Sequence, residues 1–371
     1  MHLFSKLLLV GAFSWAMFGI TPKKNTQQTL YGTDSTSNNV AKLLAGLPTE
    51  GEVFQGLAKL PACQKHYTAF QQSWQALTNK RLSKIQAWRD KELLDWKTKT
   101  YNVFYPFSGP DFLNAYQLFP EADNYLLLGL EQVGQLPKIN DLKGAYLDNY
   151  LTNVRQGLSE IFDRNYFITS RMSGAVKGVL PIISVFLART NNDIINIQKI
   201  FLQKDGKAIY TTLGDNSKQL LAGVRIIFKN KDRQLTQHLY YFGTDVSDAH
   251  IANKPELLTF LKGFEDKVTL IKSASYLLHT VPFGTMRNLI LQQSKAVLQD
   301  DTGVPYKYFS TNTWETQLYG KYAKPISDFN YGYQKDLDAV FLIDKNIKPI
   351  NFTFGYHWWT DKSSILYFKK K

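Results

Sequence analysis

The chain has little cysteine: Cys63 is the only one among 371 residues. A lone thiol cannot form an intrachain disulfide, and it cannot build a cysteine-based metal cluster. It is typically a small buried apolar group, although it could pair between chains in an oxidising compartment. The cysteine content therefore excludes a disulfide scaffold and a zinc–cysteine site.

The sequence also lacks the short motifs that mark common catalytic centres. It contains no G-x-S-x-G, S-x-x-K, H-E-x-x-H, C-x-x-C or G-x-x-x-x-G-K-[ST]. Ser108, Ser273 and Ser275 remain as serines that could act as nucleophiles, but the sequence does not show their spatial partners. Whether the protein is an enzyme stays open.

Acidic residues are in the minority. The chain has 44 Lys and Arg against 31 Asp and Glu, a formal net charge of +13. This balance favours an anionic ligand of the cell envelope, such as lipid headgroups or an acidic polymer. The basic residues are dispersed, and the only dense run, Lys369–Lys371, is typical of a solvated end. We expect no nucleic-acid partner.

Long apolar runs are scarce. The run from Leu7 to Ile20 is shorter than the roughly 20 residues that a membrane-spanning helix needs. It follows the basic residue Lys6, as the apolar region of a secretory signal peptide does. An N-terminal core helix or an uncleaved anchor is the alternative. We expect residues 1–20 to be a signal peptide or anchor, residues 21–39 a flexible tether, and the protein to be exported to the periplasm. Membrane contact, including a tether to the inner membrane, would be through this segment alone.

Residues 40–371 are predicted to form one α/β domain that begins with a helical segment, 40–100. Apolar residues there recur at helical spacing, so they share one face that is either core or a surface for a partner helix. These residues are Tyr67, Phe70, Trp74, Leu77, Ile85 and Trp88.

The rest of the domain alternates between strand and helix patterns. Residues 101–107, 111–119 and 124–131 predict a βαβ unit with two parallel strands, and 223–230 with 237–244 predict an antiparallel hairpin. A helix at 255–264, a long strand at 267–278, a helix at 283–294 and a short strand at 296–301 follow. Residues 350–359 and 363–370 predict a final hairpin. The fold class is α/β, a mixed parallel/antiparallel sheet with flanking helices.

The loop Ser108-Gly109-Pro110-Asp111 joins the first strand to its helix. Proline in a first helical turn, Ser or Gly at the cap and a carboxylate near the helix start make an ordinary strand-to-helix turn. The same loop ends a parallel strand, where open α/β sheets bind ligands. Ser108 and Gly109 are therefore candidate ligand contacts.

Glu131 lies 131 − 111 = 20 residues after Asp111, at the end of the next strand. Rossmann-type and methyltransferase-type domains place a ribose-binding acid in this way. A single glycine followed by proline disfavours a nucleotide loop, because such loops need several glycines. Asp111 and Glu131 are candidate acid/base residues.

A second candidate region covers "KSASYLLH" (272–279) and "LQDDTGVPYKYF" (298–309). Asp300 and Asp301 could bind a divalent cation through oxygen, or form an Asp-type turn. His279 could be a general base or a metal ligand near Asp300, or a strand-end histidine with a backbone partner. Tyr306 is a candidate ligand contact, and Trp359 could stack on a sugar ring or pack at an edge.

The strings "FYPFSGPDFLNA", "KSASYLLH", "LQDDTGVPYKYF" and "LYGKYAKPI" resemble those of a family of exported bacterial proteins with no assigned function. The resemblance spans about residues 101–337. It implies location in the envelope of a Gram-negative bacterium and brings no catalytic residues.

Three hypotheses follow. The first is a periplasmic protein that binds a small or polymeric, anionic envelope ligand. The second is a metal-assisted or acid/base hydrolase that uses Asp111, Glu131, His279, Asp300 and Asp301 in one cleft. The third is a scaffolding protein of the envelope whose helical N-terminal segment recruits a partner.

Overall fold

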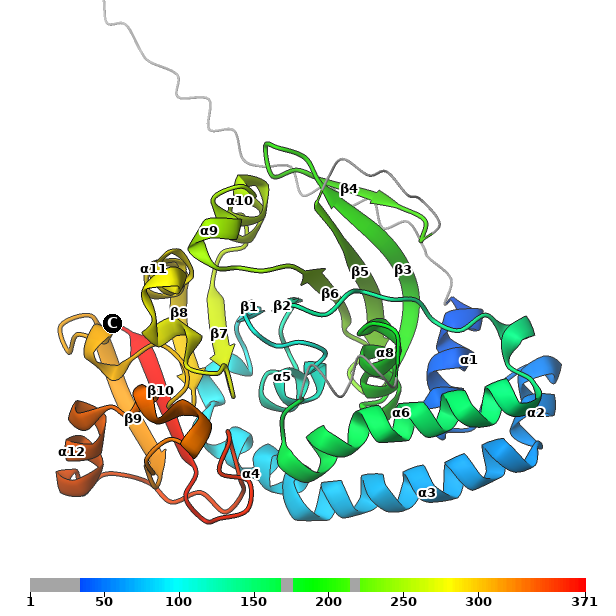
Figure 1. The fold of residues 1–371 in the computed structure, drawn as a ribbon, viewed down its shortest axis with the longest axis horizontal. Coiled ribbons are helices and arrows are strands. Elements are labelled where there is room, and N and C mark those ends of the chain that lie inside the picture. Colours follow the sequence, from blue (N-terminus) through cyan, green and yellow to red (C-terminus); the bar gives the residue numbers. More distant parts are fainter. Residues whose placement is uncertain (1–33, 168–175, 214–220) are drawn as a thin grey trace, which may run out of the picture. The chain divides into compact units, whose positions relative to one another are not determined.

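The computed structural model describes residues 34–167, 176–213 and 221–371 (Figure 1). The expected signal peptide and most of the expected tether, up to residue 33, lie outside the described residues. Within them the fold is mixed α/β, as the sequence predicts. A helix already begins at Ser35, inside the segment expected to be a flexible tether. None of the described helices is both long and apolar enough to cross a membrane.

The described strands are β1 (Asn102–Tyr105), β2 (Asn124–Gly129), β3 (Asn192–Leu202), β4 (Ala208–Thr211), β5 (Leu221–Asn230), β6 (Thr236–Gly243), β7 (Lys267–Ile271), β8 (Ser294–Gln299), β9 (Trp314–Gly320) and β10 (Ser364–Lys370). The described helices are α1 (Ser35–Leu44), α2 (Glu52–Ala58), α3 (Pro61–Leu77), α4 (Ser83–Glu92), α5 (Phe112–Leu118), α6 (Gly144–Arg164), α8 (Leu180–Arg189), α9 (Asp248–Ile251), α10 (Pro255–Lys262), α11 (Gly284–Gln293) and α12 (Lys335–Ile343).

All ten described strands form one sheet, in the order β4-β3-β5-β6-β2-β1-β7-β8-β10-β9. The five central strands, β6 to β8 in this order, are parallel, and the outer pairs are antiparallel. From β1 the chain passes to β2, then to the outer strands β3, β4 and β5, and comes back to β6 beside β2. It then crosses to the other side of β1 for β7 and β8. The winding therefore reverses between β1 and β7, which makes a topological switch point.

Helices cover both faces of this sheet (Figure 1), because its central strands are apolar on both sides. In β1, Val103 and Tyr105 point to the core formed with α1, α3 to α6 and α8, and Phe104 points to the core formed with α9 to α12. Side chains that alternate along a strand explain this division.

The aromatic face of the N-terminal helical segment belongs to the core. Helices α3 and α4 are joined by a π-helical turn, Thr78–Leu82, and run on as one long element. Phe70 and Ile85 are buried, and Trp74 packs edge-on against Phe162 of α6 at 5.9 Å between ring centroids. The partner that covers this face is thus another helix of the same chain.

The predicted βαβ unit is confirmed as β1-α5-β2, and the predicted hairpin as β5-β6. Two predictions are wrong. The strand expected at 267–278 ends at Ile271, because the chain enters a left-handed conformation at Ser273. Residues 350–359 form no strand, and β10 instead pairs with β8 and β9, so that both of its edges are occupied.

Candidate functional site

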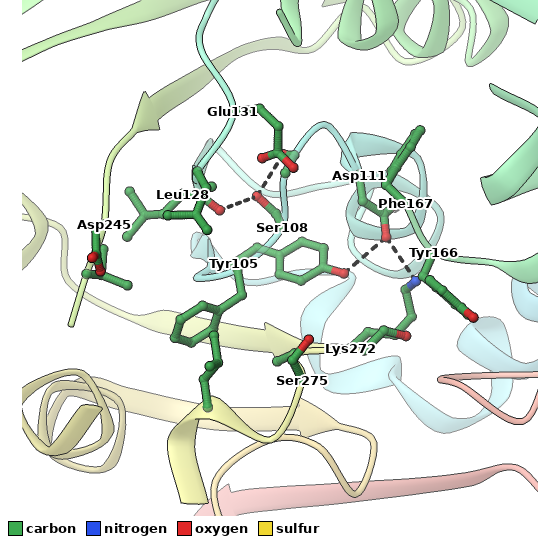
Figure 2. A pocket seen from close by; sticks show the side chains of 18 of the residues that line it. Tyr105, Ser108, Asp111, Leu128, Glu131, Tyr166, Phe167, Asp245, Lys272 and Ser275 are labelled. Carbon is green, nitrogen blue, oxygen red and sulfur yellow. Dashed lines mark hydrogen bonds and ion pairs between the residues drawn. The ribbon is translucent and has the colours of Figure 1, made fainter. Parts of the chain in front are cut away.

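A cavity of about 320 Å³ opens at the carboxyl ends of four neighbouring parallel strands. The loops after β1, β2, β6 and β7 form most of its wall, and Tyr166, Phe167, Phe283 and Tyr356 complete it (Figure 2). Because β1 and β7 flank the switch point, this is where an open α/β sheet binds its ligands. The position follows from strand order alone and does not depend on any motif.

The loop after β1 is a closed turn whose donors are used by the protein. The backbone N–H groups of Ser108 and Gly109 donate to the Leu128 carbonyl at 2.8 and 3.3 Å, and Ser108 Oγ donates to the same oxygen at 3.0 Å. Asp111 caps α5 by accepting from Asn114 N at 3.1 Å. The N-cap of α5 is therefore Asp111, and not Ser108 or Gly109. The backbone N–H groups of Ser108 and Gly109 are already hydrogen-bonded within the protein, so this loop offers them to no phosphate group.

A buried ion pair forms the floor of the cavity (Figure 2). Asp111 Oδ2 lies 3.1 Å from Lys272 Nζ, and the two side chains are 3% and 1% exposed. Tyr105 Oη donates to the same carboxylate at 3.0 Å, and Asn114 Nδ2 donates to it as well. Lys272 also donates to the Asn165 carbonyl at the end of α6. Burial lowers the pKa of Lys272, and the charge of Asp111 opposes that shift.

Glu131 is held near the mouth by two glycines. A Cβ on Gly129 would lie 2.7 Å from Glu131 Oε2 and 2.9 Å from the Cα of Gly109. A Cβ on Gly109, whose φ is +51°, would lie 3.3 Å from the same carboxylate oxygen. Tyr241 Oη donates to the Glu131 carbonyl at 2.8 Å. Side chains at these two positions would push the carboxylate away from the β1 loop.

The loop after β7 is strained. Ser273, Ser275 and Tyr276 have φ values of 53°, 51° and 55°. A non-glycine residue in this left-handed region costs on the order of 1–3 kcal/mol and persists only where its surroundings hold it. Ser273 Oγ lies in this loop, buried and without a hydrogen-bond partner among the described residues.

The surroundings that hold this loop are the two adjacent aspartates and their neighbours. Asp300 Oδ2 accepts from Ser273 N at 2.8 Å, and Thr302 Oγ1 accepts from Ala274 N at 2.8 Å. Tyr276 Oη donates to Asp301 at 2.5 Å. Burial, followed by the charge of Asp300, raises the pKa of Asp301 to about 7. In this geometry both carboxylates position the loop.

The proposed divalent cation finds no ready ligand set there. No group of three or more His, Cys, Asp or Glu side chains within the described ranges could hold a metal ion. The Asp300 oxygens accept from the backbone N–H groups of Ser273 and Thr302. This is the hydrogen bonding of the Asp-type turn that the sequence left as an alternative.

The structure brings together six of the eleven candidate residues. The cavity is lined by Ser108, Gly109, Asp111, Glu131, Ser273 and Ser275; Asp300 and Asp301 lie behind its β7 loop. His279, Tyr306 and Trp359 do not line it either.

These three residues have separate surroundings. His279 lies in the 3₁₀ turn Leu277–His279, and burial lowers its pKa to about 4, so its ring is neutral at pH 7. Tyr306 packs on Phe368 at 6.2 Å, and Trp359 is 56% exposed. The hydrolase hypothesis needed His279 in the same cleft as Asp111, and the geometry does not supply that.

Sequence reasoning missed several residues of the cavity, among them Tyr105, Asp245 and Tyr356. It gave no role to Lys272, which begins the second candidate region. Asp245 follows β6, and its place in the cavity depends on the parallel pairing of β6 with β2. A hairpin prediction for β5-β6 does not contain that pairing. Polar residues that follow parallel strands meet at one edge of the sheet. Applying this rule to every predicted strand, and not only to β1 and β2, would have pointed to Asp245 and Lys272.

The lining combines negative charge with aromatic rings. Three carboxylates, on Asp111, Glu131 and Asp245, face one ammonium group, on Lys272. Phe107 and Phe283 pack edge-on at 5.7 Å, and Tyr166 and Tyr356 at 4.9 Å. Such a cavity suits a neutral or cationic ligand with a ring and hydroxyl or amine donors.

Nucleophilic catalysis has little support in this lining. Of the described residues that line the cavity, none is a histidine. Ser275 Oγ is within 3.0 Å of Tyr356 Oη, and burial raises the pKa of that tyrosine above its ordinary value. A tyrosine that holds its proton in this way is a poor general base for a serine.

Comparison with known proteins adds no family: no protein-family model matches the chain, and no curated protein matches it. The resemblance to exported bacterial proteins therefore stays a prediction.

Proposed function

We propose that the protein binds a small organic ligand in the cavity at the carboxyl edge of its parallel strands. The ligand class is a neutral or cationic molecule with a flat or saturated ring and adjacent hydroxyl groups, as in a nucleoside or a sugar. The observation that carries the proposal is the position of the cavity at the switch point, between β1 and β7.

The polar groups have separate roles in this proposal. Glu131 accepts hydrogen bonds from ligand hydroxyls at the mouth, while the Asp111–Lys272 pair provides a fixed polar floor. The aromatic walls cover the ring. A dinucleotide is disfavoured for two reasons. The N–H groups of Ser108 and Gly109 already donate to the Leu128 carbonyl, and the carboxylate of Asp111 occupies the N-terminus of α5 as its cap.

We also propose that binding takes place in the periplasm, which rests on the signal-like residues 1–20 and on the resemblance to exported proteins. A fusion of residues 1–40 to alkaline phosphatase tests this. Enzymatic activity of the fusion in intact cells is expected, and an inactive fusion retained in the cytoplasm would refute export.

The binding proposal is tested by calorimetric titration with adenosine, uridine and glucose. At least one should bind the wild type, and Glu131→Gln should weaken that binding by about tenfold, the worth of one hydrogen bond to a charged group. Glu315→Gln removes the same charge from an exposed position on β9 and is the control. Failure of all three probes, or equal affinities for the two variants, would refute the proposal.

A further inference from the structure

A second cavity, of about 400 Å³, lies at the opposite edge of the parallel strands. It is bounded by the end of α5 before β2, by the turn before β6 and by residues Arg189 and Thr190 before β3. Helices α3 and α4 of the N-terminal segment form its other wall. The site is thus separate from the cavity of the proposed function.

Three arginines line this second cavity: Arg89 of α4, Arg189 of α8 and Arg233 of the β5-β6 turn. Asp232 is the only acidic residue in the described lining, and its Oδ1 accepts from Asn191 at 2.7 Å. The charge of the lining is therefore positive.

The arginines are incompletely neutralised. Arg189 is held by the carbonyls of Ala45 and Gly46 and by Gln71 Oε1, and it has no ion pair with a described carboxylate; burial lowers its pKa to about 10. Arg233 has its nearest carboxylate, Glu121, 3.7 Å from Nη1. Of the three, Arg89 alone has a close carboxylate partner, in Asp90 at 2.8 Å.

The guanidinium groups are nevertheless fixed in place. Arg89 Nη1 donates to the Gln117 carbonyl at 3.0 Å, and Arg233 Nη2 donates to Tyr116 Oη at 2.5 Å. Arg189 stacks over Phe70 at 4.6 Å. Positive groups that are ordered before a ligand arrives lose little entropy on binding it.

We propose that this arginine cavity binds a phosphate-bearing small molecule. Guanidinium forks match the oxygens of a phosphate group, and a phosphate carries more charge than a single carboxylate. The ligand then compensates the charge of Arg189, which has no described acidic partner, and part of the charge of Arg233, whose carboxylate partner is 3.7 Å away. The dispersed positive charge of the chain, +13 in all, brings such an anion to the surface.

Calorimetric titration with pyrophosphate, in sodium chloride of matched ionic strength, tests this. The wild type should bind it more tightly than it binds sulfate or citrate. Arg233→Gln should weaken binding about tenfold or more, and Arg233→Lys should recover part of the loss because it keeps the charge without the fork. Lys204→Gln removes one positive charge from the exposed β3-β4 turn and should change the affinity less than about twofold.

Gln86→Glu provides a second variant that does not depend on the β5-β6 turn. Gln86 is exposed on α4 and lines the cavity, so the new carboxylate should weaken pyrophosphate binding by repulsion while the helix stays folded. If citrate or sulfate binds as tightly as pyrophosphate, the phosphate assignment is wrong. If neither Arg233→Gln nor Gln86→Glu changes the affinity, pyrophosphate binds elsewhere and the proposal is refuted.

Discussion

The parallel strands carry a cavity at each end, and the two cavities differ in charge and in how that charge is compensated. At the carboxyl edge, three carboxylates surround one lysine, and Asp111 and Lys272 neutralise each other within the protein. At the amino edge, three arginines face one aspartate, and Arg189 lacks any described acidic partner. We therefore expect the two edges of one sheet to bind ligands of different charge. The positive net charge of the chain matches the arginine cavity and not the cavity at the carboxyl edge.

The largest effect is expected from Lys272→Met, which breaks the internal compensation at the carboxyl edge. It leaves the buried Asp111 carboxylate without its partner, which costs about 3–5 kcal/mol of stability. Urea denaturation measures this. Lys295→Met is the control: its pair with Asp266 is 3.8 Å long and exposed, so its loss should barely move the midpoint. A small effect of Lys272→Met would mean that the Asp111–Lys272 pair does not contribute to stability.

Gly129→Ala should damage the carboxyl edge alone. The added Cβ meets Glu131 Oε2 and Tyr241 Oη at 2.7 Å, so we expect a loss of about 1–3 kcal/mol and weaker binding at the carboxyl edge. Gly56→Ala in α2 meets nothing within 4 Å, and it should stabilise the protein by about 0.5–1 kcal/mol. Thermal unfolding compares the two. If Gly129→Ala also lowers the affinity for pyrophosphate, the two edges are coupled, and the claim that they bind ligands independently is contradicted.

Asp301 makes the carboxyl edge sensitive to pH. Its folded pKa is about 7, above the ordinary value of 3.8, so the unfolded chain releases this proton first as pH rises. Its contribution to stability therefore falls between about pH 4 and pH 7 and is level above that. Asp301→Asn should be more stable than wild type at pH 8 by on the order of 1–3 kcal/mol, with the difference vanishing near pH 4.

Chemical denaturation at several pH values measures this difference. Asp148→Asn, on the exposed side of α6, should show no such dependence. A constant difference between wild type and Asp301→Asn across the pH range would place the proton on another group of the cluster.

The sequence predicted the elements with strong patterns and failed where tertiary contacts decide. Apolar runs and the Pro110-Asp111 pair located β1, α5 and β2, because periodicity and capping are local. The end of β7 at Ile271 could not be predicted from the local sequence. The left-handed turn at Ser273 depends on a hydrogen bond to Asp300, which lies far along the chain. The final hairpin failed for a similar reason, as β10 finds its partners in β8 and β9.

The candidate sites divide in the same way. Ser108, Gly109, Asp111 and Glu131 could be placed together because one βαβ unit carries all four. Lys272 and Asp245 join them only through the order of β6, β2, β1 and β7, which no local pattern contains. The arginine cavity was invisible in the sequence, since Arg89, Arg189 and Arg233 are spread over three distant elements.

The central claim is that the two edges bind different ligands independently, and one crossed titration tests it most directly. Glu131→Gln and Arg233→Gln are each titrated with pyrophosphate and with whichever of adenosine, uridine or glucose binds the wild type. We predict that Glu131→Gln weakens only the second ligand and Arg233→Gln only pyrophosphate, each by about tenfold. If one variant weakens both ligands equally, or neither variant weakens either, the two-site account is contradicted.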